Sequence, residues 1–184
     1  MVTWYIFFLL LFGAERIAEL ILSRRNARLA FARGAVESGA RHFRFMVAVH
    51  ALFLPACAAE VLLLHRPVPG AAGFAAAGLA LAAQALRWWA IASLGEHWNV
   101  RVIVLPDAPP VRRGPYRFVR HPNYLAVAVE MLCVPLAHGA WITALVFSAL
   151  NALLLRGRIR IEERALGDHY QRAFAGVPRF VPHG

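Results

Sequence analysis

The chain contains no lysine, few acidic residues and only two cysteines. All twenty basic residues are arginine, which we ascribe to genome composition, against ten Asp and Glu. Cys57 and Cys133 both lie inside apolar runs, which argues against a disulfide framework or a thiol metal site. We predict that both are small buried hydrophobic residues.

Several motifs that mark common classes of enzyme are also missing. There is no Gly-x-Gly-x-x-Gly after a strand, no Walker A loop, no His-Glu-x-x-His and no Gly-x-Ser-x-Gly. The chain has no room for a doubly wound sheet, which excludes a soluble Rossmann-type methyltransferase or dehydrogenase. No nucleic-acid-binding module is recognisable. A channel or transporter remains an alternative function, although internal repeats with paired broken helices are not evident.

Long hydrophobic runs dominate what is present. Hydrophobic residues make up 60% of the 184 residues, against roughly 45–50% in an ordinary soluble domain. A helical span needs ~20 apolar residues, and the last run is too long for one span and is interrupted at Pro135, His138 and Gly139. We therefore predict one all-α domain over residues 1–184, an integral membrane bundle of five transmembrane helices: 2–22, 45–64, 70–94, 123–137 and 140–155. The last two are short for a full crossing.

The arginines lie mainly in two loops and the C-terminal tail. They fall between helices one and two, between helices three and four, and after helix five, whereas the loop between helices two and three has only Arg66. The positive-inside rule then places the N-terminus outside, and both long loops and a helical tail in the cytoplasm. We expect a bacterial inner-membrane protein whose arginines face anionic head groups.

A few charged residues interrupt the apolar runs. Part of one face of the first helix carries three of them: Glu15, Arg16 and Glu19. Charges in hydrocarbon are costly, so we expect pairing inside the bundle, for example with Arg87. Glu60 is expected near the outer end of its helix, within reach of the interface. Glu130 either neutralises an arginine or lines a cavity, and the sequence does not separate these two roles.

Residues 114–124 gather polar side chains at the edge of an apolar run. Pro115 and Pro122 restrict the backbone on both sides, so the residues between them are held in a turn. The segment supplies hydrogen-bond donors, an acceptor and a group that titrates near neutral pH: Arg120, His121, Asn123 and Tyr124. It is either a basic juxtamembrane anchor or a ligand-binding corner at the membrane surface, and we favour the second.

Arg158 and Glu162 follow the last span and are spaced i,i+4, so they lie one turn apart on one helix face. In a purely structural interpretation they would form a solvated ion pair that contributes a few tenths of a kcal/mol to stability. Functionally they offer a guanidinium for an anionic oxygen and a carboxylate for a cationic or hydroxyl-bearing ligand. The functional interpretation is favoured because the loop that carries His121 emerges on the same cytoplasmic face.

Ordered motifs in residues 94–184 closely resemble the isoprenylcysteine carboxyl methyltransferase family. These motifs are Leu94-Gly-Glu-His-Trp-Asn99, Gly114-Pro-Tyr116, Arg120-His-Pro-Asn-Tyr124 and Arg158-x-x-x-Glu162. The resemblance implies a multi-helix membrane methyltransferase that uses S-adenosylmethionine, with the cofactor-binding half at about residues 94–184. Residues 34–39, Gly-Ala-Val-Glu-Ser-Gly, with His42 and residues 45–54, resemble a bacterial branch encoded beside type III polyketide synthases, whose members O-methylate alkylpyrones.

The resemblance also implies roles for individual residues. The expected cofactor-binding residues are Tyr116, His121, Pro122, Asn123, Tyr124 and Glu162, with Arg101 at a further contact. Backbone groups of residues 108–111, ending at Val111, would line the same pocket, although Pro109 and Pro110 remove two donors. Arg158 matches the arginine that meets the acceptor and is the expected catalytic and substrate-binding residue.

These parts fit methyl transfer from a sulfonium to an oxygen anion, which needs little acid–base chemistry when the acceptor is already ionised. The enzyme would contribute orientation and water exclusion, on the order of 7–11 kcal/mol, and no metal. We expect a lipophilic small-molecule acceptor, membrane lipids around the bundle, and no nucleic acid or obligate protein partner. The acceptor is expected to be an alkylpyrone or related long-chain polyketide, with an isoprenylcysteine carboxylate as the alternative. A non-enzymatic membrane scaffold or transporter is the competing class.

Overall fold

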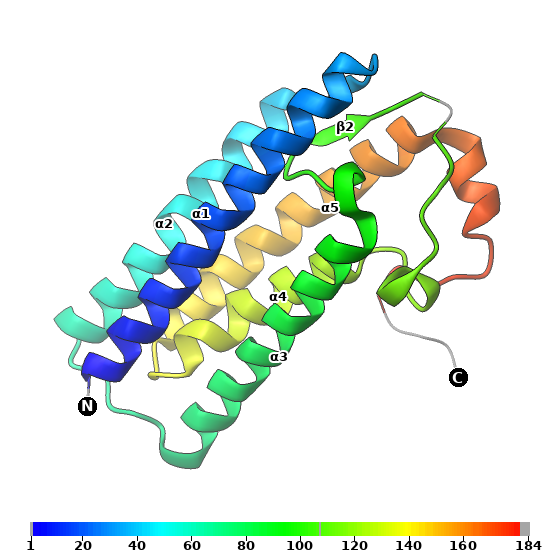
Figure 1. Ribbon diagram of the computed structural model, residues 1–184. Helices are drawn as coiled ribbons and strands as arrows, with labels where there is room; N and C mark the ends of the chain where they lie inside the picture. The colour runs from blue at the N-terminus through cyan, green and yellow to red at the C-terminus, as the bar shows by residue number, and fades with distance from the viewer. Residues whose placement is uncertain (1, 107, 181–184) are drawn as a thin grey trace.

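The structure, a computed structural model, describes residues 2–106 and 108–180 as a bundle of long helices (Figure 1). The long helices are α1 (Val2–Ala32), α2 (Ala40–Leu63), α3 (Gly70–Leu94), α4 (Pro122–Leu136) and α5 (Trp141–Ala173). Short elements join them: β1 (Val36–Ser38), β2 (Val102–Val104) and the 3-10 turns η1 (Gly95–His97) and η2 (Gly114–Arg117). The N-terminus and the α2–α3 connection lie at one end of the bundle, and β2 and the last turns of α5 lie at the other (Figure 1).

Three helices differ from their predicted bounds by more than one residue. α1 continues ten residues beyond 22 and α5 continues to Ala173, because helical propensity persists after the apolar run that marks a span has ended. α5 bends at Gly167, whose φ of 67° is not helical. α2 begins at Ala40 instead of 45, directly after Gly39 in the left-handed region. α3 has the predicted bounds, and α4 is shifted by one residue.

The predicted helical membrane fold is confirmed in its coarse form. Within the described ranges, three helices are long and apolar enough to cross a membrane: Ala40–Leu63, Gly70–His97 and Trp141–Ala173. α4 is apolar but has 15 residues, shorter than the ~20 of a full span. α1 carries three charges along its apolar run. Crossing by all five helices therefore stays a prediction.

Two of the three charged residues predicted to pair inside the bundle, Arg16 and Glu19, do so. Glu15 has no ion-pair partner among residues 2–106 and 108–180, and its buried Oε2 accepts no hydrogen bond there. Arg87 Nη2 donates to Glu19 Oε2 at 2.6 Å. Arg16 bridges two carboxylates, with 2.9 Å to Glu19 and 2.6 Å to Glu130. Of the two roles left open for Glu130, the structure shows the neutralising one. These pairs join α1, α3 and α4.

Glu60 lies in the last turn of α2, near the end of its helix as predicted. Its side chain is 8% exposed and is bound against the start of α5 instead of extending outward. Its carboxylate accepts hydrogen bonds from the backbone N–H of Thr143 at 2.6 Å and the Thr143 hydroxyl at 2.7 Å, and it pairs with Arg66 at 3.0 Å. It therefore satisfies the unpaired N–H groups at the start of α5, which the sequence does not reveal because the two residues are far apart in the chain.

An apolar core fills the half of the bundle away from β2. Tyr5, Phe12, Cys57 and Val134 are almost completely buried there, and both cysteines are free and buried as predicted. The Tyr5 hydroxyl donates to the carbonyl of Val134 at 3.1 Å, so its one polar atom is satisfied.

A short antiparallel pair of strands closes the other end. Val36 pairs with Val104, and Ser38 pairs with Val102. This pair was not predicted, because three-residue strands show no usable alternation of polar and apolar residues. It holds the α1–α2 connection against the segment between α3 and α4.

Candidate functional site

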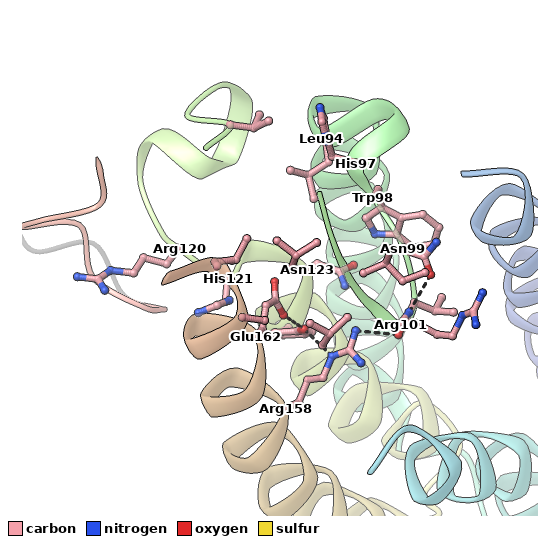
Figure 2. A pocket seen from close by; sticks show the side chains of 18 of the residues that line it. Leu94, His97, Trp98, Asn99, Arg101, Arg120, His121, Asn123, Arg158 and Glu162 are labelled. Atoms are coloured by element: carbon pink, nitrogen blue, oxygen red, sulfur yellow. Dashed lines mark hydrogen bonds between the residues drawn. The ribbon is translucent and has the colours of Figure 1, made fainter. Parts of the chain in front are cut away.

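A cavity of about 780 Å³ lies at the end of the bundle that carries β2 (Figure 2). Its wall includes residues from every long helix and from the segment 97–111. Eight of the nine predicted site residues line it: Arg101, Val111, Tyr116, His121, Asn123, Tyr124, Arg158 and Glu162. Pro122, the ninth, is buried at the start of α4 and is not part of the wall. The structure thus brings together residues that lie up to 61 positions apart, Arg101 and Glu162.

Arg158 and Glu162 project from α5 toward the cavity and meet Tyr124 of α4 (Figure 2). The Tyr124 hydroxyl donates to Glu162, and Arg158 Nε donates to the Tyr124 hydroxyl at 3.0 Å. Arg158 Nη2 donates to the carbonyl of Val100 at 2.8 Å. These contacts hold a guanidinium and a carboxylate in fixed positions one helical turn apart, which an exposed i,i+4 pair would not achieve.

His121 contacts Glu163 and not Glu162. The His121 ring is 3% exposed, stacks on Tyr124 with centroids 5.3 Å apart, and has Nε2 3.1 Å from Glu163 Oε1. Glu163 also accepts from Arg179 Nη2 at 2.6 Å, and this hydrogen bond raises the pKa of Arg179. Sequence reasoning gave Glu163 no role. The sequence did contain a signal for this role, the two consecutive acidic residues Glu162 and Glu163, because neighbouring residues on a helix point to different sides.

A C-terminal segment, residues 177–179, lies against the start of α4. The backbone N–H of Arg120 donates to the carbonyl of Pro178 at 2.9 Å, and that of His121 donates to the carbonyl of Arg179 at 3.1 Å. Arg120 Nε also donates to the carbonyl of Val177 at 2.6 Å. This arrangement was missed, since nothing in residues 177–179 marks them as partners of residues 120–121.

The turn before α4 depends on a glycine. Gly114 has a φ of 57°, and a Cβ there would lie 2.0 Å from Ser93 Oγ, so a side chain has no space. The turn places Tyr116 in the wall with 7% exposure, and burial raises the pKa of its phenol, which stays protonated at neutral pH. The need for glycine in the Gly-Pro-Tyr motif is therefore explained by the contact with Ser93 and the backbone conformation of the turn.

Arg101 lies on the opposite wall from His121 (Figure 2). Its guanidinium pairs with Glu37 of β1 at 2.9 Å and lies over the Phe31 ring at 5.5 Å. Residues 108–111 also line the cavity. A ligand that binds Arg101 would therefore also face the strand pair.

The cavity offers complementary groups for a polar ligand. Asn123 Oδ1 is buried and has no hydrogen-bond partner among residues 2–106 and 108–180, so it can accept from an amino or hydroxyl group. Glu162 provides negative charge for a cation, and Arg158 provides positive charge for an anion. The volume lies in the ~300–1,000 Å³ range of small-molecule sites. These features suit two ligands that exchange a group.

Comparison with known proteins gives a consistent result. Residues 76–168 match the model of the isoprenylcysteine carboxyl methyltransferase (ICMT) family, a range that contains all nine predicted site residues. The chain is 38% identical over 155 residues to the "Uncharacterized protein YpbQ" of Bacillus subtilis (strain 168), covering 84% of this chain and 92% of the relative. It is 29% identical over 161 residues to an "Uncharacterized protein" of Haemophilus influenzae (strain ATCC 51907 / DSM 11121 / KW20 / Rd), covering 87% and 93%.

Proposed function

Because the chain belongs to the isoprenylcysteine carboxyl methyltransferase family and is thereby a membrane methyltransferase, we propose that it transfers the methyl group of S-adenosylmethionine to an acidic oxygen of a lipophilic acceptor. The observation that carries this proposal is the fixed Arg158–Tyr124–Glu162 arrangement inside one cavity. It offers a carboxylate for the positively charged methyl donor and a guanidinium for the negatively charged acceptor oxygen.

The residues present fit the methyl donor. The buried Asn123 Oδ1 and the Glu162 carboxylate are acceptors for a ligand that carries amino groups, hydroxyls and positive charge. We assign its binding to Tyr116, His121, Asn123, Tyr124 and Glu162, with Arg101 and the backbone at Val111 as further contacts. Pro122 contributes by starting α4 at a fixed point.

Arg158 is assigned to the acceptor. Its Nε and Nη2 are held by Tyr124 and Val100, so the guanidinium is positioned before the acceptor binds. When bound, S-adenosylmethionine supplies a methyl group whose carbon–sulfur bond breaks as a carbon–oxygen bond forms, the electron pair of the broken bond staying on sulfur. The protein orients the acceptor oxygen and excludes water, effects that together contribute on the order of 7–11 kcal/mol.

The apolar part of the wall supports a lipophilic acceptor. Leu20, Val47 and Val127 line the cavity, and Leu20 and Val47 remain 43% and 46% exposed. We propose an alkylpyrone or related long-chain polyketide as the acceptor, because residues 34–54 resemble that branch. An isoprenylcysteine carboxylate is the second candidate, and the family match over residues 76–168 favours it.

We also propose a bacterial inner-membrane location with the cavity facing the cytoplasm. The support is the arginine distribution, since the loops and tail at the cavity end carry most of the arginines and the α2–α3 connection carries only Arg66.

Binding tests this assignment in purified protein in detergent. Calorimetry with S-adenosylhomocysteine should show binding that His121→Ala and Glu162→Ala weaken by roughly tenfold or more, since each removes a contact to a polar ligand. Arg158→Ala should change it little. Glu96→Gln is the matched control, because Glu96 is half exposed and, among residues 2–106 and 108–180, pairs with Arg33 alone. Absence of binding by the parent protein would contradict the proposal.

A further inference from the structure

The cavity has a second polar region, deeper in the bundle than Arg158. We call it the deep cluster, and it consists of the cavity-lining residues Arg16, Glu19, His50 and Arg87. Glu19 and Arg87 are 2% and 5% exposed, so this region is enclosed by protein. The proposed methyl transfer uses none of these four residues. Apolar residues line the same cavity: Leu20, Val47, Ala51 and Val127.

The deep cluster carries no surplus positive charge. The guanidinium groups of Arg16 and Arg87 are matched by the carboxylates of Glu19 and Glu130, with 2.6 Å contacts for Arg87–Glu19 and Arg16–Glu130. Glu15, a neighbour on α1 outside the cavity wall, would only add negative charge. An anionic ligand therefore gains no net attraction there, whereas a neutral polar group can use individual donors and acceptors.

One donor of Arg87 makes no hydrogen bond to the described residues, although it lies within ion-pair distance of Glu130. Arg87 Nη1 is buried, has no hydrogen-bond partner in the part of the chain that the structure describes, and lies 3.7 Å from Glu130. A buried N–H without a partner is costly, so a ligand atom that accepts from it is stabilised.

His50 supplies an acceptor. Its Nδ1 lies 2.8 Å from the carbonyl of Met46, and because a carbonyl only accepts, Nδ1 carries the proton. Nε2 of the neutral ring is then an acceptor, on a residue that lines the cavity. A guanidinium N–H together with an imidazole nitrogen complements a hydroxyl, and the N–H alone complements a carbonyl oxygen.

The spacing between the two polar regions defines the shape of a ligand. Tyr124 contacts Arg158, and Glu130 contacts the deep cluster. They lie six residues apart on α4, which corresponds to ~9 Å along the helix. The residues of α4 between Tyr124 and Glu130 are all apolar.

From these contacts we propose that the acceptor has two polar ends: the acidic oxygen held by Arg158 and, ~9 Å away along the hydrocarbon, a neutral hydroxyl or carbonyl oxygen bound by Arg87 and His50. The identity of the first end rests on the proposed function. The deep cluster is then a specificity site that distinguishes oxygenated from plain alkyl chains.

A matched pair of acceptors tests the proposal. One is a 6-alkyl-4-hydroxy-2-pyrone, and the other carries a single hydroxyl on the chain ~9 Å from the 4-oxygen. Calorimetry without S-adenosylmethionine gives Kd for each, and initial rates with it give kcat/KM. The hydroxylated probe should bind and react about tenfold better, the effect of one hydrogen bond to a charged donor.

Two variants locate the effect. His50→Leu breaks no ion pair and should bring the preference to within about twofold. Arg87→Met should remove the preference as well, and His50→Leu keeps the test valid if Arg87→Met fails to fold. Val47→Ala is the control, because it alters the apolar wall and should affect both probes equally.

The outcomes separate this inference from the proposed function. Equal Kd values in the parent protein, or a preference that survives His50→Leu, would overturn the deep cluster as a specificity site even if methyl transfer proceeds. A tenfold difference in Kd without any methylated product would support the deep cluster and contradict the proposed function instead.

Discussion

His121 at the start of α4 and Glu163 in α5 lie 3.1 Å apart between Nε2 and Oε1, and both are buried. Glu162, the preceding residue, contacts Tyr124 in the cavity wall. Two adjacent carboxylates therefore have separate tasks. Glu162 lines the cavity, and Glu163 contacts His121 and, through Arg179, the C-terminal segment 177–179.

Glu163→Gln should loosen the C-terminal segment 177–179 and leave the cavity-lining carboxylate of Glu162 in place. The neutral amide keeps the shape but loses the ion pair with Arg179, which is 57% exposed, so the loss of stability should be at most about 1 kcal/mol. Amide hydrogen exchange should rise at Arg120 and His121, whose N–H groups donate to Pro178 and Arg179. Glu162→Gln is the comparison and should leave this exchange unchanged while weakening S-adenosylhomocysteine binding.

Gly114→Ala should destabilise the turn that carries Tyr116. The added Cβ would lie 2.0 Å from Ser93 Oγ at a φ of 57°, so both a clash and backbone strain arise, together about 2–4 kcal/mol. Thermal unfolding in detergent measures this. Gly34→Ala is the control, because its φ of 85° gives strain with nothing within 4 Å of the new Cβ. Equal effects of the two substitutions would show that the contact with Ser93 does not matter.

Glu130→Leu should be strongly destabilising. It leaves Arg16 with Glu19 alone, shared with Arg87, so a buried positive charge loses its partner at a cost of about 3–5 kcal/mol. Arg33→Ala removes the half-exposed pair with Glu96 and should change stability by less than about 1 kcal/mol. Unfolding of both variants in the same detergent gives the comparison, and similar losses would argue against buried pairing as the main effect.

The positions of the long helices and of the turn that contributes to the candidate site could be predicted from the sequence, because both depend on local features. Apolar runs mark α2 and α3, and Pro115 and Pro122 mark the turn before α4. What was missed depends on long-range contacts. Glu60 caps α5 from eighty positions away, and Glu163 reaches His121 and Arg179. The β1–β2 pair has too few residues to leave a periodic pattern.

The orientation of the bundle gives a separate prediction. Reporter fusions should place residues 24–44, 95–122 and 156–184 in the cytoplasm and residues 65–70 outside, because the arginine-rich segments stay on the cytoplasmic side. A cytoplasmic reporter that is active when fused at Arg66 would contradict this topology.

Methyl transfer by the purified protein tests the central claim most directly. Labelled S-adenosylmethionine is incubated with an alkylpyrone or with an isoprenylcysteine, using the parent protein and Arg158→Ala. We predict label in the pyrone methyl ether, with a rate that falls about 10²–10³-fold in Arg158→Ala while S-adenosylhomocysteine affinity is retained. Label found only in the prenylcysteine methyl ester would show that the second acceptor is the right one. Label in neither acceptor, or an unchanged rate in Arg158→Ala, would contradict the account.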